Sequence, residues 1–176
     1  MESSVSTYEK FRSINTFVFD VDGVLTDGSL MVNDEGEQMR TFNIKDGYAL
    51  QLAVKTGYQV AIISGGKSEG IRKRMQTLGI VDVFLGVHTK LNTYKAFSFN
   101  RRAKSENTLY MGDDIPDIEA MSLVGLPVCP ADACEEVKAI SHYISPKNGG
   151  KGCVRDVIEK VMKLQGMWAA EKAMSL

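Results

Sequence analysis

The sequence predicts one α/β domain, built on a doubly wound, mostly parallel, Rossmann-like sheet. Short apolar runs typical of buried strands alternate along the chain with patterns typical of amphipathic helices. The chain has 176 residues, of which 44% are apolar and 24% charged, as in a single globular domain with a substantial core. Because no repeat, linker or low-complexity segment divides it, we expect residues 1–176 to form a single domain.

The first third of the chain predicts a strand, a hairpin and a helix. The apolar run over about residues 14–19 is typical of a buried strand. Two short β-like runs around Asp34-Glu35-Gly36 predict a hairpin, the flap, over about residues 28–43. Asp46 is the expected N-cap of the next helix, because an Asp side chain can accept a hydrogen bond from a free first-turn amide. Gly57 is the expected left-handed residue at its end.

The remaining elements continue the alternation. Ser68 is expected to open a helix in which Ile71, Met75 and Leu78 share one face. Strands joined by helices in this way line up in parallel, with helices covering the sheet. The other expected strands cover about residues 58–63, 83–85, 108–111, 126–129 and 142–144, and the other expected helices cover about residues 89–99, 118–123, 133–140 and 152–164.

Two carboxylates follow the first predicted strand. Asp20 and Asp22 are two residues apart, so on an extended backbone both side chains point to the same side. Gly23 then lets the chain turn away without adding a side chain to the site. Like charges at this separation repel each other, so the pair requires a cation or a shared proton.

Polar groups also end the neighbouring strands. One strand ends at Ser64-Gly65, Lys90 opens the helix after the next, and another strand is followed by Asp113-Asp114. Parallel sheets bind ligands where the strands present their C-terminal ends. Mg²⁺, which prefers carboxylates and substrate phosphate as ligands, would relieve the repulsion among the acids. Since Ser64 and Lys90 can donate to phosphate oxygens, the set predicts phosphoryl transfer.

Four motifs, in the order in which they occur here, resemble those of the haloacid dehalogenase superfamily of phosphotransferases. They are Asp20-Val21-Asp22-Gly23, Ser64-Gly65, Lys90 and Gly112-Asp113-Asp114. The resemblance covers about residues 14–158. It implies that Asp20 is the nucleophile, which forms an aspartyl-phosphate, and that Asp22 is the general acid and base.

The same resemblance implies the roles of the surrounding groups. Mg²⁺ would be held by Asp20, the Asp22 carbonyl and Asp113. Asp114 and Asp117 would orient waters or Lys90 from outside the ligand shell. The phosphate would be bound by Ser64, Gly65 and Lys90.

We expect no cap domain, although most members of the superfamily carry one. Only the flap separates Gly28 from the following helix, and little separates Lys90 from Asp113. A small-molecule phosphatase must still shield its reaction from water. Either a macromolecular substrate or a neighbouring subunit must therefore close the pocket. The apolar flap residues fit a contact with a neighbour, and they fit equally an edge hairpin folded on its own core.

Three longer stretches, residues 20–28, 43–47 and 112–117, are similar to the family of 3-deoxy-D-manno-octulosonate 8-phosphate phosphatases. This implies a Mg²⁺-dependent homotetramer that releases phosphate from an eight-carbon sugar-acid phosphate, a small molecule, during synthesis of the lipopolysaccharide precursor. In that family the hairpins associate centrally and neighbouring chains contribute to each pocket. One departure is Gly65-Gly66-Lys67, where many members have Gly-Arg after the serine. A related family that acts on nine-carbon sugar-acid phosphates is similar but has Glu at the Gly66 position. The absence of this Glu here favours the eight-carbon substrate.

The substrate carboxylate requires a cation, for which family analogy suggests Arg74 first and Lys67 second. The alternative for Arg74 is that residues 72–74 form a solvated helix face. Four other functions remain as alternatives: a phosphatase of a nine-carbon sugar-acid 9-phosphate, a catalytically silent oligomerisation module, an uncapped phosphoprotein phosphatase, and a receiver domain. The complete set of motif residues disfavours the silent module and the receiver domain.

Composition and charge exclude several classes of partner. A net charge of −1 gives no electrostatic reason to expect nucleic acid or an anionic membrane as a partner. The three cysteines are odd in number and lack Cys-x-x-Cys spacing, which indicates thiols in a reducing compartment. No signal-like or membrane-spanning run is present, so we expect a cytoplasmic protein. The apolar tail, about residues 165–176, is expected either to dock on a neighbouring subunit or to fray.

Overall fold

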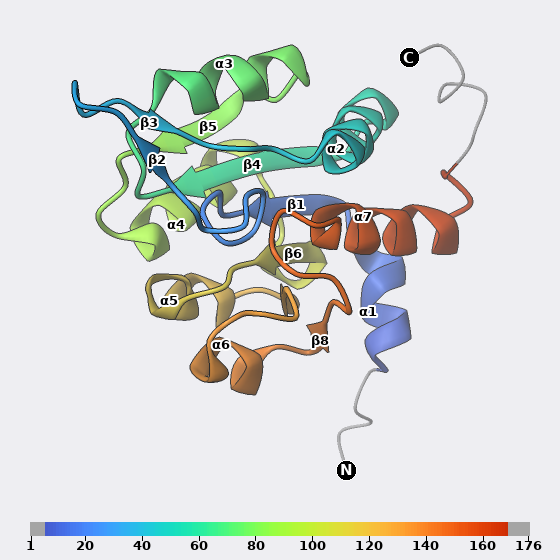
Figure 1. Ribbon diagram of the computed structural model, residues 1–176. Coiled ribbons are helices and arrows are strands. Elements are labelled where there is room, and N and C mark those ends of the chain that lie inside the picture. The colour runs from blue at the N-terminus through green and yellow to red at the C-terminus, as the bar shows by residue number, and fades with distance from the viewer. Residues whose placement is uncertain (1–5, 169–176) are drawn as a thin grey trace.

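Six parallel strands form the central sheet in a computed structural model that describes residues 6–168 (Figure 1). Their order across the sheet is β5-β4-β1-β6-β7-β8. In the middle, Phe19 of β1 pairs with Ile62 of β4 on one side and with Met111 of β6 on the other. The chain winds outward from β1 in both directions, which confirms the predicted doubly wound sheet. The strands are β1 (Thr16–Phe19), β4 (Gln59–Ser64), β5 (Asp82–Leu85), β6 (Thr108–Met111), β7 (Leu126–Cys129) and β8 (Tyr143–Ile144).

Helices cover both faces of the sheet, and the side chains of β1 alternate between the two cores. Phe17 and Phe19 point into one hydrophobic cluster and Val18 into the other. Because β1 is buried on both faces, its apolar residues form a continuous run and do not alternate with polar ones. The first cluster packs against α1 (Thr7–Ser13), α2 (Ile44–Thr56), α3 (Glu69–Thr77) and α7 (Cys153–Leu164), and the second against α4 (Lys90–Arg101), α5 (Ile118–Met121) and α6 (Glu135–Ile140). Two 3₁₀ turns, η1 (Ser105–Asn107) and η2 (Ile115–Asp117), flank β6.

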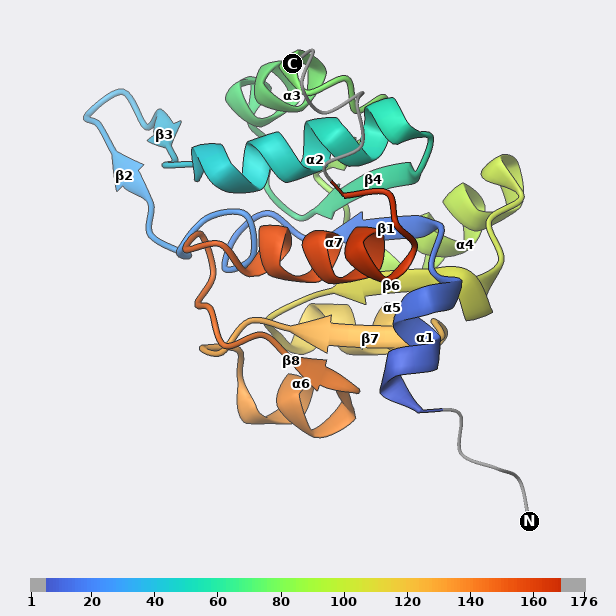
Figure 2. The ribbon, with the colours of Figure 1, turned by 90° about the vertical axis from the view of Figure 1, so that its right-hand side faces the viewer.

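The predicted flap is an antiparallel hairpin that projects from the body of the molecule (Figure 2). Its strands, β2 (Met31–Val32) and β3 (Gln38–Met39), are joined through a turn in which the Gly36 amide donates to the Asn33 carbonyl. Both strands expose their apolar side chains, and Met31 is 67% exposed. The flap therefore does not fold onto the core of its own chain. Within the described range it is the only insertion between β1 and α2, so no cap domain covers the sheet from this position.

The N-cap predicted for α2 was wrong. Asn43 is the N-cap, and its side chain accepts a hydrogen bond from the Lys45 amide at 2.8 Å. Asp46 lies inside the first turn, where its carboxylate accepts a hydrogen bond from the Arg155 amide of α7 at 2.7 Å. Asp46 thus satisfies a free amide of the neighbouring helix, whose own N-cap is Gly152. The left-handed end of α2 at Gly57, with φ of 101°, was predicted correctly.

The chain termini add two features. Helix α1 was not predicted, although the capping box formed by Ser6 and Glu9 marks its start. At the other end, Trp168 packs edge-on against Tyr48, with ring centroids 6.2 Å apart. This part of the predicted tail contacts its own chain, while the remainder, residues 169–176, lies outside the described residues. Among the helices described, none combines the length and the apolar character needed to span a bilayer.

Candidate active site

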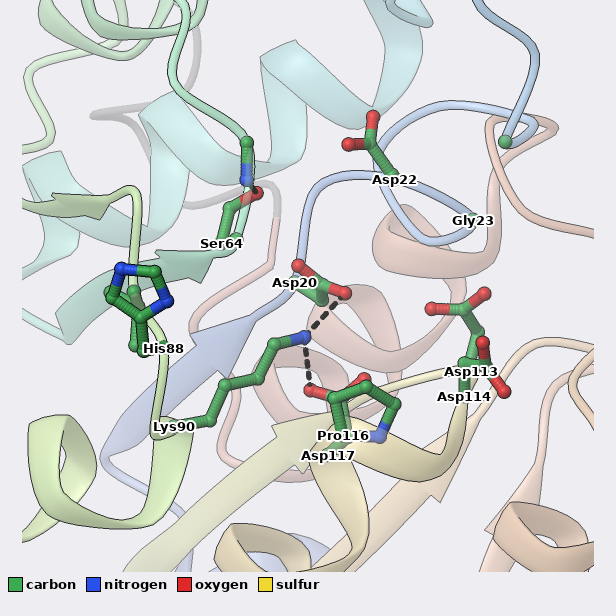
Figure 3. Close-up of a pocket in the computed structure, with 14 residues that line it drawn as sticks. Asp20, Asp22, Gly23, Ser64, His88, Lys90, Asp113, Asp114, Pro116 and Asp117 are labelled. Atoms are coloured by element: carbon green, nitrogen blue, oxygen red, sulfur yellow. Dashed lines mark hydrogen bonds and ion pairs between the residues drawn. The ribbon is translucent and has the colours of Figure 1, made fainter.

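The C-terminal ends of β1, β4 and β6 meet at one edge of the sheet, where they border a cavity of about 560 Å³ (Figure 3). This is the position at which open α/β sheets bind ligands, because the direction of winding reverses at β1. The structure brings together here most of the residues singled out in the sequence. The cavity is lined by Asp20, Asp22, Gly23, Ser64, Gly65, Lys90, Asp113, Asp114 and Asp117, among others.

Lys90 forms the centre of a buried charge network. Its Nζ donates to Asp20 Oδ2 at 2.6 Å and to Asp117 Oδ1 at 2.7 Å (Figure 3). The hydroxyl of Tyr110, which is fully buried on β6, donates to the same Asp117 oxygen at 3.0 Å. Burial lowers the pKa of Lys90, but the two carboxylates outweigh this effect and hold the pKa above its ordinary value. Lys90 is therefore held as a cation between two acids.

Asp20, Asp113 and Asp117 form a cluster in which one oxygen from each lies within 4.8 Å of the others. Burial, followed by repulsion from Asp117, raises the pKa of Asp20 to about 7 from an ordinary value of 3.8. Burial, followed by repulsion from Asp20, likewise raises the pKa of Asp113 to about 7. One lysine therefore does not neutralise the cluster, because two of its acids still resist ionisation.

The donor set fits a hard divalent cation. Asp113 Oδ1 and Asp117 Oδ2 are buried and have no hydrogen-bond partner in the part of the chain that the structure describes. Buried acceptors without partners are costly, and a cation together with the waters that it binds would satisfy them. The Asp22 carboxylate does not belong to this cluster, so only its backbone carbonyl remains as the predicted ligand from that residue.

A tight turn after β1 sets the geometry of the cluster. The Val21 carbonyl accepts hydrogen bonds from the amides of Leu25 at 2.9 Å and Thr26 at 3.0 Å. Gly23 has φ of +82° in this turn, and a Cβ at this position would lie 1.9 Å from Asp113 Oδ2. Only glycine therefore permits both the turn and the approach of Asp113. This is the physical reason for the Asp-x-Asp-Gly pattern in this chain.

Ser64 and Gly65 border the opposite side of the cavity. The Ser64 side chain is buried at the end of β4, and its Oγ accepts a hydrogen bond from the Gly66 amide at 3.1 Å. The hydroxyl proton of Ser64 is therefore available to donate to an anion beside Asp20. Together with Lys90, this loop supplies the donors that a phosphate group requires.

Two predicted substrate-binding residues do not line this cavity. Arg74 lies on α3 against α2, where a Cβ on Gly47 would come within 2.4 Å of its Nη2. Lys67 is exposed beside Gly86 and borders a separate hollow between the flap and the loop after β4. Asp114 does reach the cavity, but its carboxylate accepts from the Ile115 amide.

Three residues near the site were not predicted from the sequence. Arg40, at the end of the flap, forms an ion pair with Asp22, and Tyr110 donates to Asp117. His88 is exposed at the edge of the cavity. Arg40 comes from a segment with no motif, and Tyr110 occupies a strand position that alternation alone assigns to the core.

Comparisons with known proteins agree with this geometry. Residues 79–158 match the family model of haloacid dehalogenase-like hydrolases. The 3-deoxy-D-manno-octulosonate 8-phosphate phosphatase of Salmonella typhi is 36% identical over 98% of this chain and 93% of its own length. The phosphatase of the same name from Escherichia coli K12 is 34% identical over 98% of this chain and 92% of its own.

Solved structures extend the similarity to the whole fold. The phosphatase of this name from Moraxella catarrhalis, in complex with magnesium, phosphate and KDO, superposes with a TM-score of 0.90 at 34% identity and covers 96% of this chain and 97% of that one. A cobalt-bound form from Haemophilus influenzae gives a TM-score of 0.88 at 31% identity over 95% and 99% of the two chains. The chain therefore belongs to the haloacid dehalogenase-like hydrolases, in the family of the 3-deoxy-D-manno-octulosonate 8-phosphate phosphatases.

Proposed function

We propose that this protein is a Mg²⁺-dependent phosphomonoesterase that hydrolyses 3-deoxy-D-manno-octulosonate 8-phosphate to the free sugar acid and phosphate. The observation that carries the proposal is the buried cluster of Asp20, Asp113 and Asp117, bridged by Lys90 at the switch point of the sheet. Similarity over nearly the full chain to phosphatases of that name supports the substrate. The reaction belongs to the synthesis of the lipopolysaccharide precursor.

Asp20 is the proposed nucleophile. One of its carboxylate oxygens forms a bond to phosphorus in line with the breaking bond to the sugar oxygen, which yields an aspartyl-phosphate. Asp22 donates a proton to the departing sugar oxygen and then removes a proton from the water that attacks phosphorus. That second attack releases inorganic phosphate and returns Asp20 as a carboxylate. Lys90 Nζ, 2.6 Å from Asp20 Oδ2, keeps the nucleophile oriented.

The remaining residues of the site bind and orient. Ser64, Gly65 and Lys90 hold the phosphate oxygens, while Asp114 and Asp117 orient waters and Lys90. Asp20, the Asp22 carbonyl and Asp113 would hold Mg²⁺, which would supply positive charge to offset the charge of the phosphate oxygens. The orphaned Asp113 Oδ1 supports this ligand assignment.

The protein is proposed to be a cytoplasmic homotetramer of a single-domain chain. The cavity lacks a cap within the described chain, whereas the flap exposes Leu30, Met31, Val32 and Met39. An apolar surface of this kind supports a subunit contact. In such an assembly Arg74 and Lys67, which lie outside the cavity of their own chain, would meet a substrate carboxylate only across a subunit contact. Light scattering on the purified protein tests the assembly.

Phosphate release from a panel of substrates tests the proposed function. The panel contains the eight-carbon sugar-acid 8-phosphate, a nine-carbon sugar-acid 9-phosphate, a neutral sugar phosphate and a phosphopeptide, each with Mg²⁺ or EDTA. We expect the highest kcat/KM for the eight-carbon substrate and loss of turnover with EDTA. A preference for the nine-carbon acid would overturn the substrate assignment, and inactivity on the whole panel would overturn the function.

Mg²⁺ is expected to stabilise the protein more at pH 8 than at pH 6. The pKa values of Asp20 and Asp113 are both raised to about 7 from 3.8. Carboxyls with raised pKa values favour folding below pH 3.8, and this contribution is lost as the pH rises through about 7. At pH 8 the acids are ionised and repel one another, so the cation binds without displacing protons.

Thermal unfolding with and without Mg²⁺ measures this effect. We expect saturating Mg²⁺ to raise Tm by about 5 °C at pH 8 and by less than half as much at pH 6. Asp113→Asn should remove most of the increase at both pH values. An equal increase in the wild type at both pH values would show that these acids do not bind the ion.

A further inference from the structure

Tyr110 carries a hydroxyl group into the interior of the sheet, beneath the proposed active site. It lies on β6, where it pairs with Val18 of β1 on one side and with Pro127 of β7 on the other. Its side chain is fully buried in the hydrophobic cluster that faces α4, α5 and α6. A buried hydroxyl is costly unless it finds a hydrogen-bond partner. The partner here is Asp117 Oδ1, at 3.0 Å.

The two oxygens of Asp117 have different surroundings. Oδ1 accepts from the Tyr110 hydroxyl and from Lys90 Nζ, the latter at 2.7 Å. Oδ2 is buried without a partner in the described part of the chain. With Lys90 as its only donor, the carboxylate could tilt whenever the lysine moved. A second donor on a central strand fixes the place of Oδ1 independently of Lys90.

The backbone holds Asp117 close to β6 but leaves its carboxylate free to turn. A Cβ on Gly112 would lie 2.4 Å from Asp117 Cβ, so glycine is required at position 112 for this approach. The Asp117 amide donates to the Asp114 carbonyl at 3.0 Å, which closes the turn. These contacts fix the main chain of Asp117. The direction of its carboxylate therefore depends on the two donors, Tyr110 and Lys90.

Lys90 depends on this anchor because its side chain is long and flexible. Its Nζ lies between two acceptors, Asp20 Oδ2 at 2.6 Å and Asp117 Oδ1 at 2.7 Å (Figure 3). If Asp117 Oδ1 moved, the ammonium group would either follow it or remain bonded to Asp20 alone. Both changes alter the direction from which Lys90 holds Asp20.

We propose that Tyr110 is a positioning residue, whose hydroxyl fixes Asp117 so that Lys90 holds the Asp20 carboxylate in line with phosphorus. This inference rests on the proposed phosphatase function. Hydrogen bonds of 3.0, 2.7 and 2.6 Å connect the interior of the sheet to Asp20. Tyr110 does not line the cavity, so it acts only through the other residues. Attack in line tolerates little misalignment, so a less firmly held Asp20 reacts more slowly with phosphate that is bound equally well.

Tyr110→Phe removes the hydroxyl and keeps the ring in the core. We expect kcat for the sugar-acid phosphate to fall about 10-fold at saturating Mg²⁺, because Asp20 is aimed less well. KM should stay within about 2-fold of the wild-type value, since the phosphate-binding groups of Ser64 and Gly65 are untouched. Initial rates of phosphate release over a range of substrate concentrations separate the two parameters.

Tyr94→Phe is the matched control. Tyr94 lies on α4, the helix that also carries Lys90, and it is buried in the same cluster as Tyr110, with ring centroids 6.2 Å apart. Its hydroxyl donates to Ser105 Oγ at 3.0 Å and has no link to Asp117. Both variants lose one hydrogen-bonded hydroxyl, so Tm should fall by a similar 2–4 °C or so in each.

Only Tyr110→Phe should lower kcat, and Tyr94→Phe should stay within about 2-fold of the wild type. An unchanged kcat in Tyr110→Phe, a rise in KM alone, or an equal loss of kcat in the two variants would each overturn the positioning role.

NMR of the Lys90 ammonium group tests the same role independently of turnover. In protein labelled with ¹⁵N-lysine, without Mg²⁺, the buried Nζ of Lys90 should give a signal distinct from those of exposed lysines, and its loss in Lys90→Arg identifies it. Tyr110→Phe should shift or broaden this signal, whereas Tyr94→Phe should leave it in place. An unchanged signal in Tyr110→Phe would overturn the inference. Failure of the proposed function is distinguishable, because the wild-type protein would then be inactive although its Lys90 signal still responded to Tyr110→Phe.

Discussion

Asp20→Asn is expected to lower kcat by at least about 1,000-fold while the protein stays folded, because the amide cannot replace the carboxylate as a nucleophile. Asparagine has nearly the same shape and can still accept the hydrogen bond that the Val21 amide donates at 2.6 Å. The substitution also removes one of the mutually repelling buried charges, so stability should not fall sharply. Phosphate release measures turnover, and thermal unfolding measures stability.

Asp34→Asn is the matched control for this substitution. Asp34 lies exposed in the turn of the flap, so the same chemical change there should leave kcat within about 2-fold of the wild-type value. Substantial turnover by Asp20→Asn would remove the nucleophile assignment. Equal losses in the two variants would point to a general effect of the changed charge.

Lys90→Met is expected to damage both stability and activity. Lys90 is 8% exposed and is the common ion-pair partner of Asp20 and Asp117. Its removal leaves two buried carboxylates without their counter-charge, which costs about 3 kcal/mol or more at pH 8 without Mg²⁺. For a chain of this length, that loss of stability corresponds to a fall in Tm of about 6–12 °C. Turnover should be lost as well, since in the proposed mechanism Lys90 both binds phosphate and orients Asp20.

Two further variants make this result specific. Lys163→Met removes a lysine that is 59% exposed and paired with Glu159, so its cost should stay below about 1 kcal/mol. Adding Asp117→Asn to Lys90→Met should restore part of the lost stability, because it removes one of the stranded charges. If the Lys90→Met and Lys163→Met variants unfold at the same temperature, the buried charge network around Lys90 does not contribute to the stability of the folded protein as described.

The fold was predictable because its strands are short apolar runs with distinct ends. Phe17, Val18 and Phe19 are apolar in succession, which is typical of a strand covered on both faces. The convergence of Asp20, Ser64 and Asp113 was also predictable, since each lies at or just after the end of a parallel strand. Topology alone places such residues at one edge of the sheet.

The contacts that could not be predicted join segments through tertiary packing. Asn43 and Asp46 are both residue types that can cap a helix N-terminus. Which of them caps α2 depends on α7, because the Arg155 amide of α7 donates a hydrogen bond to the Asp46 carboxylate. Arg40 lies in the flap, and no local sequence pattern indicates how the flap is oriented relative to the sheet. The contact between Arg40 and Asp22 could therefore not be predicted. Arg74 follows helical spacing on α3, but the approach of Gly47 on α2 determines what it contacts.

Chemical trapping of the phosphorylated enzyme tests the central claim most directly. The reaction of the sugar-acid phosphate with the Mg²⁺-loaded protein is quenched in acid within one turnover and then treated with borohydride, which reduces an aspartyl-phosphate to homoserine. Peptide mass spectrometry then locates the modified residue. The proposed mechanism predicts homoserine at position 20 and unmodified Asp22. Homoserine at position 22 or 113, or rapid phosphate release with no trapped residue, would contradict it.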